Sequence, residues 1–386
     1  MKRSTDRVLT THAGSLPRPD DVLDMLRSGQ KGEPFEVRVR EAVAEIVRQQ
    51  VEHGLDVVDD GEVSKPSFVT YATERLGGLE LRPAEPIATS SFAGSREHLA
   101  FPEFYAAVGA PSAGGVGRDR PMRSVCTSPI RYVGHQAVQR DIANLKAALQ
   151  NVDAAEAFLP AISPSNVQAY ITNEFCASDE EFQVAIADAL HEEYKAIADA
   201  GLVLQVDDPR LVTQYIRDPS LSIAECRAWA ERHVEILNHA LRDIPEDRIR
   251  FHTCYSINMG PRVHDMQLKD IVDVILKIRA GAYSFEAANP RHEHEWQVWE
   301  TVKLPEGKVL IPGVITQSTV LVEHPELVAQ RIERFAGAVG RENAIAGADC
   351  GFATFAGSTE IHPSIAWAKL DALVEGARLA SASLWQ

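Results

Sequence analysis

The stretch "DEEFQVAIADALHEEYKAIADAGLVLQVDDP", residues 179–209, contains the unit from which the fold can be predicted. Its first part is long and amphipathic and ends at Gly201, which is typical of a helix. Its second part, "LVLQVDDP" (202–209), is a short apolar run that ends in two aspartates. The order predicts a helix that leads into a buried strand with polar residues at its end.

The same alternation recurs along the whole chain. Short apolar runs lie at residues 7–15, 55–62, 157–163, 202–209, 249–256, 282–289, 308–314 and 344–351. Long amphipathic segments lie between them, such as "EVRVREAVAEIVRQQVEHG" (36–54) and "PELVAQRIERFAGAVG" (325–340), each with a glycine at its end. Eight strands that alternate with helices predict a (β/α)₈ TIM barrel, and we expect residues 1–386 to form one catalytic domain.

Residues 79–136 do not fit this alternation. They contain the Gly-rich stretch "GAPSAGGVGRDRP" (109–121) between two segments that can extend. We expect an inserted hairpin with a mobile loop between strands two and three. Such insertions usually overhang the active face of a barrel.

The composition excludes several classes of partner. The chain has 39 Lys and Arg against 55 Asp and Glu, a net charge of −16, which argues against binding of nucleic acid or an anionic membrane. We find no signal-peptide pattern and no apolar run of about 18 residues. The five cysteines are odd in number and far apart, which fits reduced thiols and a cytoplasmic protein. The oligomeric state is left open, a homo-oligomer included.

Polar residues and one glycine stand where most of the predicted strands end. They are His12, Gly14 and Ser15; Asp59, Asp60 and Glu62; Asp207 and Asp208; His252 and Cys254; Glu286; and Asp349 and Cys350. In a barrel the carboxyl ends of all strands meet on one face, where catalysis takes place. We therefore expect these residues to converge on one site.

A metal site is the most specific interpretation of this set. Residues two apart on a strand point the same way, so His252 and Cys254 share a direction. Together with Cys350 and Glu286 they form the sulfur, nitrogen and oxygen set that Zn²⁺ prefers. Spacing alone leaves a second interpretation open, in which buried thiols lie beside a core histidine. The other three cysteines, Cys126, Cys176 and Cys226, are expected to be structural.

Several motifs together resemble the cobalamin-independent methionine synthase family. They are "TTHAGSLPRP" (10–19), "DGEVSK" (60–65), "QVDDP" (205–209), "HTCYS" (252–256), "FEAANPRHEHEW" (285–296), "VEHPELVAQRI" (322–332) and "ADCGFAT" (348–354). They occur in the order seen in the catalytic C-terminal zinc barrel of that family, over nearly the whole chain. The length matches a short core type without the second barrel.

The resemblance implies a role for each matching residue. It implies a zinc that binds a substrate thiol, with His252, Cys254, Glu286 and Cys350 as ligands, Glu286 giving way when the substrate sulfur arrives. Glu62 and Asp207 match the residues that hold the amino group of homocysteine. Gly14 and Ser15 match the turn that meets its carboxylate.

The chain departs from the family pattern in two places. Gln317 stands near the place of a histidine proposed to protonate a folate donor, and glutamine cannot act as an acid. Phe352 and Ala353 follow "DCG", where the family has a basic residue. His294, His12 or a water could supply the proton, and we take His294 with Glu286 as the catalytic candidates. The donor, methyl-tetrahydrofolate or another alkyl compound, is left open.

The leading prediction is zinc-dependent methyl transfer to homocysteine to form methionine. An alternative is a transferase like the epoxyalkane:coenzyme M enzymes, which resemble this short type; Arg18, Arg210 or Arg291 would then hold the sulfonate. Glu62 and Asp207 favour a thiol that carries an ammonium group. A third interpretation is a zinc-containing barrel that binds thiols without chemistry. The metal-free uroporphyrinogen decarboxylases would leave His252 and Cys350 without a role.

Overall fold

A curled parallel sheet forms the centre of the molecule. The computed structural model describes residues 1–83, 94–108, 122–255, 260–358 and 361–386. Within them a seven-stranded sheet has the order β1-β4-β6-β7-β8-β9-β10, and its neighbouring strands are parallel. The strands are β1 (Val57–Val58), β4 (Glu156–Ile162), β6 (Val203–Asp207), β7 (Ile249–Thr253), β8 (Ala282–Phe285), β9 (Val309–Ile315) and β10 (Gly347–Ala348).

The segment predicted as the first strand closes the ring between β10 and β1. On one side Ala346 donates to the carbonyl of Leu9 and accepts from the amide of Thr11, both at 2.9 Å. On the other side the amide of Val57 donates to the carbonyl of Thr10 at 3.0 Å. The segment forms an isolated bridge at Thr10 rather than a regular strand, because the amide of Thr10 donates to the carboxylate of Asp56 instead of to a backbone partner. The predicted TIM-like barrel is confirmed.

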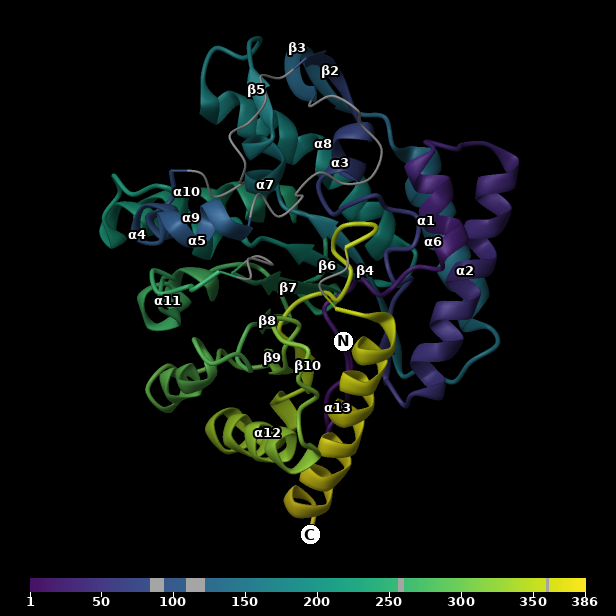
Figure 1. The fold of residues 1–386 in the computed structure, drawn as a ribbon, viewed down its shortest axis with the longest axis vertical. Coiled ribbons are helices and arrows are strands. Elements are labelled where there is room, and N and C mark those ends of the chain that lie inside the picture. The colour runs from purple at the N-terminus through teal and green to yellow at the C-terminus, as the bar shows by residue number, and fades with distance from the viewer. Residues whose placement is uncertain (84–93, 109–121, 256–259, 359–360) are drawn as a thin grey trace.

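Helices surround this ring, as Figure 1 shows. They are α1 (Asp20–Arg27), α2 (Glu33–Glu52), α3 (Thr70–Glu74), α6 (His135–Leu149), α7 (Pro164–Ala169), α8 (Asp179–Asp199), α9 (Arg210–Arg217), α10 (Ile223–Ala240), α11 (Val272–Ile275), α12 (Pro325–Val339) and α13 (Pro363–Leu384), with 3₁₀ turns η1 (Glu246–Arg248), η2 (Leu268–Asp270), η3 (Glu293–Glu300) and η4 (Arg341–Asn343). The predicted helices at 36–54, 179–200 and 325–340 correspond to α2, α8 and α12. In the described residues, no helix is long and apolar enough to cross a membrane.

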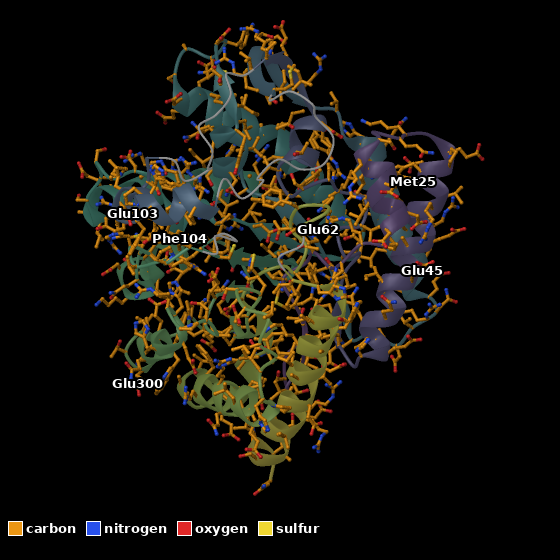
Figure 2. The ribbon with its side chains drawn as sticks, viewed as in Figure 1. Met25, Glu45, Glu62, Glu103, Phe104 and Glu300 are labelled. Atoms are coloured by element: carbon orange, nitrogen blue, oxygen red, sulfur yellow. The ribbon has the colours of Figure 1, made fainter. Side chains whose placement is uncertain are left out.

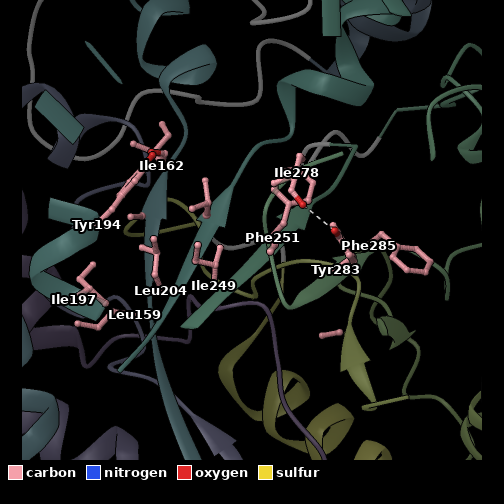
Figure 3. Packing of buried hydrophobic residues seen from close by; sticks show 14 of the residues in the cluster. Leu159, Ile162, Tyr194, Ile197, Leu204, Ile249, Phe251, Ile278, Tyr283 and Phe285 are labelled. Atoms are coloured by element: carbon pink, nitrogen blue, oxygen red, sulfur yellow. Dashed lines mark hydrogen bonds between the residues drawn. The ribbon is translucent and has the colours of Figure 1, made fainter. Parts of the chain in front are cut away.

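Alternation along each strand divides the core into two parts. Phe251 and Leu204 point outward and pack with the helices, where Figure 3 shows them among other apolar side chains. The neighbours in register point into the barrel, where small apolar clusters fill one end. Further along the same strands the inward residues become polar, as with Gln205, Asp207 and His252. The site therefore lies at the carboxyl ends of the strands.

The predicted hairpin is present in the excursion. Strand β2 (Leu76–Pro83) pairs antiparallel with β3 (Met122–Tyr132). A third strand, β5 (Ile171–Asn173), joins β3 in parallel and was not predicted. Two helices, α4 (Arg96–Ala100) and α5 (Pro102–Val108), lie on the same excursion. The loop predicted to be mobile, 109–121, lies outside the described residues.

Candidate functional site

His252, Cys254 and Cys350 form a buried cluster that could hold a metal ion. His252 belongs to β7 and Cys254 follows that strand directly, whereas Cys350 follows β10. One ligand atom from each residue lies within 4.8 Å of the others. The two sulfur atoms are 3.3 Å apart. Strand alternation thus places His252 and Cys254 as predicted, and the closure of the barrel brings Cys350 to them.

His252 is in the state that a metal ligand requires. Its Nδ1 lies 3.1 Å from the hydroxyl of Ser284 on the neighbouring strand β8. Its Nε2 is buried and has no hydrogen-bond partner among the described residues. Burial, together with the charge of Arg250, lowers the pKa of His252 to about 3, so the ring is neutral at physiological pH. With Nδ1 as the donor, the lone pair lies on Nε2, ready for a cation.

The two thiols also fit a cation. Contact with Cys254 and burial raise the pKa of Cys350 well above its ordinary value, because two thiolates this close repel each other. A divalent ion between them would remove that repulsion. Two sulfurs and one imidazole nitrogen are a donor set that zinc prefers.

Glu286 lies beside this cluster but is held by other partners. It follows β8, and its negative charge contributes to the raised pKa of Cys350. One carboxylate oxygen accepts from the amide of Tyr255 at 2.8 Å. The other accepts from Arg262 at 2.8 Å and from Asn289 at 2.7 Å. The structure therefore places Glu286 next to the three cluster residues while its carboxylate contacts a buried arginine.

Asp349 fixes the turn that carries Glu286. Its carboxylate accepts hydrogen bonds from three successive amides, those of Ala287 at 2.7 Å, Ala288 at 2.8 Å and Asn289 at 3.0 Å. Gly313 on β9 makes room for this arrangement, because a Cβ there would lie 2.1 Å from an Asp349 oxygen. Asp349 therefore ties the segment after β8 to the segment that carries Cys350.

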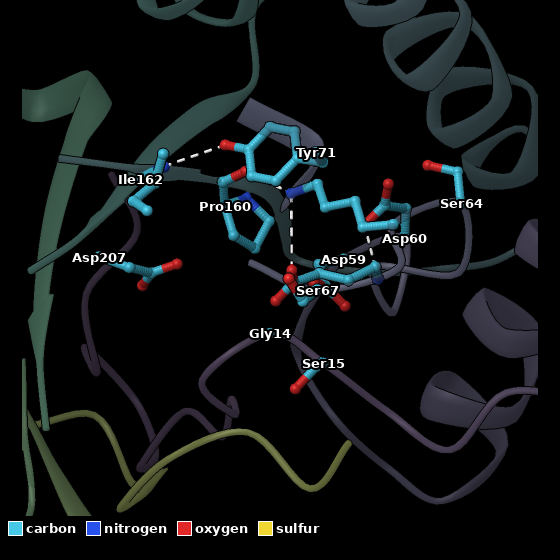
Figure 4. Close-up of polar contacts among 12 residues, drawn as sticks. Gly14, Ser15, Asp59, Asp60, Ser64, Ser67, Tyr71, Pro160, Ile162 and Asp207 are labelled. Carbon is cyan, nitrogen blue, oxygen red and sulfur yellow. Dashed lines mark hydrogen bonds and ion pairs between the residues drawn. The ribbon is translucent and has the colours of Figure 1, made fainter. Parts of the chain in front are cut away.

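Glu62 and Asp207 form an acidic pair of buried carboxylates on the same face of the barrel. Burial and the nearby charge of Glu62 raise the pKa of Asp207 well above its ordinary value. Glu62 has a φ of 52°, and its carboxylate is 3.6 Å from the ammonium of Lys65. In Figure 2, Glu62 lies near the centre of the molecule. Figure 4 shows Asp207 directed toward the segments of Gly14 and Asp59. Two buried carboxylates that repel each other favour a cationic ligand.

The Gly14–Ser15 turn connects the acidic pair with the metal-binding cluster. Gly14 has a φ of 129°, and a Cβ there would lie 2.9 Å from a Glu62 oxygen. The carbonyl of Ser15 accepts from the amide of Phe352 at 2.9 Å, two residues after Cys350. The turn predicted to meet a substrate carboxylate thus lies between the two groups of side chains.

Arg18 is occupied by backbone groups. It is buried and donates to the carbonyls of Ala353 at 2.6 Å, Glu62 at 2.8 Å and Lys65 at 2.9 Å. It therefore fastens the loops that carry the site. This placement does not support the predicted direct contact between Arg18 and a substrate anion.

The proposed proton donors lie in different surroundings. His12 is buried, and its Nε2 is 2.8 Å from Gln50; burial lowers its pKa to about 4, so it is neutral at physiological pH. His294 is exposed on η3, whereas its neighbour His292 is buried. Gln317 is buried beyond β9, and its Oε1 has no partner among the described residues.

The structure contains a polar network around Glu286 that the sequence did not predict. His292 contacts Asp265 at 3.1 Å and Glu295 at 2.8 Å, and it stacks on Tyr255. Arg262 links this group to Glu286. The motif "NPRHEHEW" contains His292 and Glu295 of this network, but its alternating charges are equally typical of the start of a helix. Arg262 stands in a loop with no periodic pattern.

The fold and the cluster define the class: a parallel barrel with a thiol-rich candidate metal centre at its catalytic face. The model of the family described as the catalytic domain of cobalamin-independent synthases matches residues 168–375, more than half of the chain. The chain belongs to this family, as the motifs predicted.

Named relatives and solved structures agree with this assignment. The chain is 22% identical over 377 residues to a methionine synthase of Thermococcus kodakarensis, which covers 96% of this chain and 92% of that protein. It is 23% identical over 297 residues to a 5-methyltetrahydropteroyltriglutamate–homocysteine methyltransferase of Thermotoga petrophila, of which it spans 33%. A B12-independent methionine synthase from Shewanella sp. W3-18-1 shares the fold, with a TM-score of 0.69, 18% identity and coverage of 98% and 99% of the two chains.

Proposed function

We propose that the protein is a zinc-dependent thiol alkyltransferase that methylates homocysteine to methionine. The observation that carries this proposal is the Nε2 of His252, which has no hydrogen-bond partner in the part of the chain that the structure describes, in a cluster with two sulfur atoms 3.3 Å apart. Membership in the cobalamin-independent synthase family supports it, as do relatives named methionine synthase and homocysteine methyltransferase. We propose that residues 1–386 act as one catalytic domain in the cytoplasm.

His252, Cys254 and Cys350 would hold the zinc, with Glu286 as a fourth, exchangeable ligand. A zinc bound there would keep a substrate thiol deprotonated and nucleophilic near neutral pH. The neutral ring of His252 requires no deprotonation to serve as a ligand, because burial already lowers its pKa. Ser284 holds that ring in one orientation.

The acidic pair would recognise the amino end of homocysteine. Glu62 and Asp207 would accept charge-assisted hydrogen bonds from the substrate ammonium, and that positive charge would favour the ionised form of Asp207. The turn of Gly14 and Ser15 would meet the carboxylate. Lys65 already contacts Glu62, so a substrate ammonium would be the second cation beside the acidic pair.

The reaction transfers one methyl group. The homocysteine sulfur releases its proton to solvent and forms a new carbon–sulfur bond with its electron pair. The bond between the methyl carbon and the donor breaks, its electrons leave with the donor, and the donor takes up one proton from solvent. His12 is neutral and tied to Gln50, so we do not assign it the proton for the leaving group.

A sulfonate thiol fits this site less well. A transferase for coenzyme M needs free cations near the metal, but Arg18 donates to three backbone carbonyls. Arg291 is exposed. Two carboxylates in the mouth would repel a sulfonate.

The test is a thiol-alkylation assay on the zinc-loaded protein. Homocysteine and coenzyme M are each paired with methyl-tetrahydrofolate and with epoxypropane. Methionine formed from homocysteine supports the proposal, whereas turnover with coenzyme M and epoxide alone contradicts it. A zinc that resists chelation and never contacts added thiol would support a barrel without chemistry.

The cysteine pair provides a matched metal control. We expect Cys350→Ser to lose bound zinc and activity while the chain still folds, because the apolar core lies outside the metal cluster. Cys126→Ala, in the hairpin, should leave the zinc content unchanged. Metal analysis and circular dichroism check both variants, and an unfolded Cys350→Ser protein would argue for a structural ion.

A further inference from the structure

A buried arginine holds the carboxylate that would otherwise be free to bind the metal. Arg262 is 5% exposed and lies in the loop after β7. Its Nη2 donates to Glu286 at 2.8 Å, and its Nε donates to Asp265 at 3.1 Å. With the amides of Tyr255 and Asn289, this satisfies both oxygens of Glu286 without a metal.

The excursion fixes the position of Arg262. Glu97 on α4 is fully buried and accepts from the backbone amides of Arg262 at 3.1 Å and His264 at 2.8 Å. Arg262 itself has a φ of 56°, a conformation that few residues other than glycine and asparagine adopt readily. A strained residue held by a buried carboxylate on another element indicates a defined position for the guanidinium.

We propose that Arg262 is a positioning residue that competes with the metal for Glu286 and so makes one ligand position available to the substrate thiol. The inference rests on the proposed zinc-dependent function. A buried carboxylate without a positive partner is costly, so Glu286 exchanges between two cations, the arginine and the metal. The planar guanidinium reaches Glu286 and Asp265 at once, which an ammonium group cannot do.

The proposal predicts that removal of Arg262 slows metal release and weakens thiol binding. When Arg262 is removed, Glu286 loses its direct cationic partner and can contact the metal instead, because the nearby His292 ring is held by Asp265 and Glu295. The metal is then held by four protein ligands and leaves more slowly, while homocysteine must displace Glu286 and binds more weakly. A merely structural role for Arg262 predicts that the metal leaves faster, because the site becomes disordered.

The experiment uses Arg262→Asn, since asparagine tolerates the positive φ of this position. Proteins loaded with Co²⁺ are mixed with a chelator to follow metal release. They are then titrated with homocysteine, and the sulfur-to-cobalt absorption reports binding. We expect slower release and about tenfold weaker thiol binding, the size of one charge-assisted hydrogen bond. Faster release, or unchanged thiol binding, overturns the proposal.

Further variants test whether the effect of Arg262→Asn is specific to its contact with Glu286. In a Glu286→Gln background the Arg262→Asn change should add nothing to either readout, because its effect passes through Glu286. Arg227→Asn is the matched control, since Arg227 makes a two-point contact with Asp273 at the surface, 2.7 Å at each end. If Arg262→Asn does not fold, Arg262→Lys carries the test with a smaller change in the same direction. A wild-type chain that binds no Co²⁺ overturns the proposed function as well.

Discussion

At the scale of single residues, the proposed recognition of a substrate ammonium depends on the buried carboxyl group of Asp207. Burial and the charge of Glu62 raise its pKa, which favours the protonated carboxyl group. An ammonium ligand reverses that preference. Homocysteine binding should therefore weaken as the pH falls through the raised pKa, because the ligand binds the ionised form.

Asp207→Asn tests this recognition. We expect homocysteine to bind roughly 10- to 100-fold more weakly, since one charge-assisted hydrogen bond contributes about 1.5–3 kcal/mol. The matched ligand is 4-mercaptobutanoate, which lacks the amino group and should bind the variant and the wild type about equally. Calorimetric titration of the zinc-loaded proteins gives both constants. Equal losses for the two thiols would rule out recognition of the ammonium.

At the scale of elements, the site depends on the contact between β9 and the segment after β10. At Gly313 a Cβ would meet not only the Asp349 side chain but also its backbone nitrogen, at 2.6 Å. Backbone atoms cannot rotate away as the end of a side chain can. A side chain at position 313 must therefore move Asp349, and with it the turn that carries Glu286.

Gly313→Ala should lower the free energy of unfolding by about 2 kcal/mol, within the range for an overpacked core. It should also weaken zinc binding, because Asp349 loses its hold on the amides of residues 287–289. Gly337→Ala is the control: it lies in α12 with nothing near its Cβ, so it should be neutral or stabilise by up to about 1 kcal/mol. Urea unfolding compares the two, and similar stabilities would contradict the packing argument.

The network on η3 should make stability depend on pH in the alkaline range. Burial lowers the pKa of His292, but its hydrogen bonds to Asp265 and Glu295 outweigh burial and raise it to about 9. Because the folded pKa exceeds the unfolded value of about 6.5, the stabilisation is complete below about pH 6.5 and is lost as the pH rises through about 9.

Between pH 7 and pH 10 the wild type should lose roughly 2–3 kcal/mol more of its free energy of unfolding than His292→Gln. The variant lacks the titrating ring, so its stability should be lower at pH 7 and close to that of the wild type at pH 10. Urea unfolding at both pH values measures the difference. Parallel losses in the two proteins would show that another group titrates.

At the scale of the whole molecule, the sequence was sufficient for the repeating part of the structure. Strand and helix periods placed most of the elements, and alternation gave His252 and Cys254 a common direction. Contacts between loops have no period, so Arg262 and its link to Glu97 could not be predicted. The pattern "HEH" did not indicate which histidine is buried. His292 directly precedes the 3₁₀ turn and lies three residues before Glu295, so the two side chains meet on one face.

The irregular first segment leads to a prediction about closure of the barrel. The seam of the barrel is the segment around Thr10 that lies between β10 and β1. There, hydrogen bonds to the carboxylate of Asp56 replace part of the regular strand pairing. Its carboxylate accepts from the amide of Thr10 at 2.8 Å and from the hydroxyl of Thr10 at 3.0 Å, and it receives two hydrogen bonds from Arg7. The carboxylate of Asp56 thus accepts hydrogen bonds at the seam in place of backbone carbonyls.

Asp56→Ala should therefore open the seam and lower the free energy of unfolding by about 2–4 kcal/mol, because the buried amide of Thr10 and the guanidinium of Arg7 lose their acceptor. Asp24→Ala is the control, since Asp24 pairs with Arg27 on the exposed face of α1 and should change stability by less than about 1 kcal/mol. Urea unfolding measures both, and amide hydrogen exchange locates the change. We expect faster exchange at residues 9–11 and 346, which lie on both sides of the seam, while the distant pairing of β6 with β7 keeps its protection. Uniform loss of protection would mean that the ring unfolds as one unit and that Asp56 has no special place in its closure.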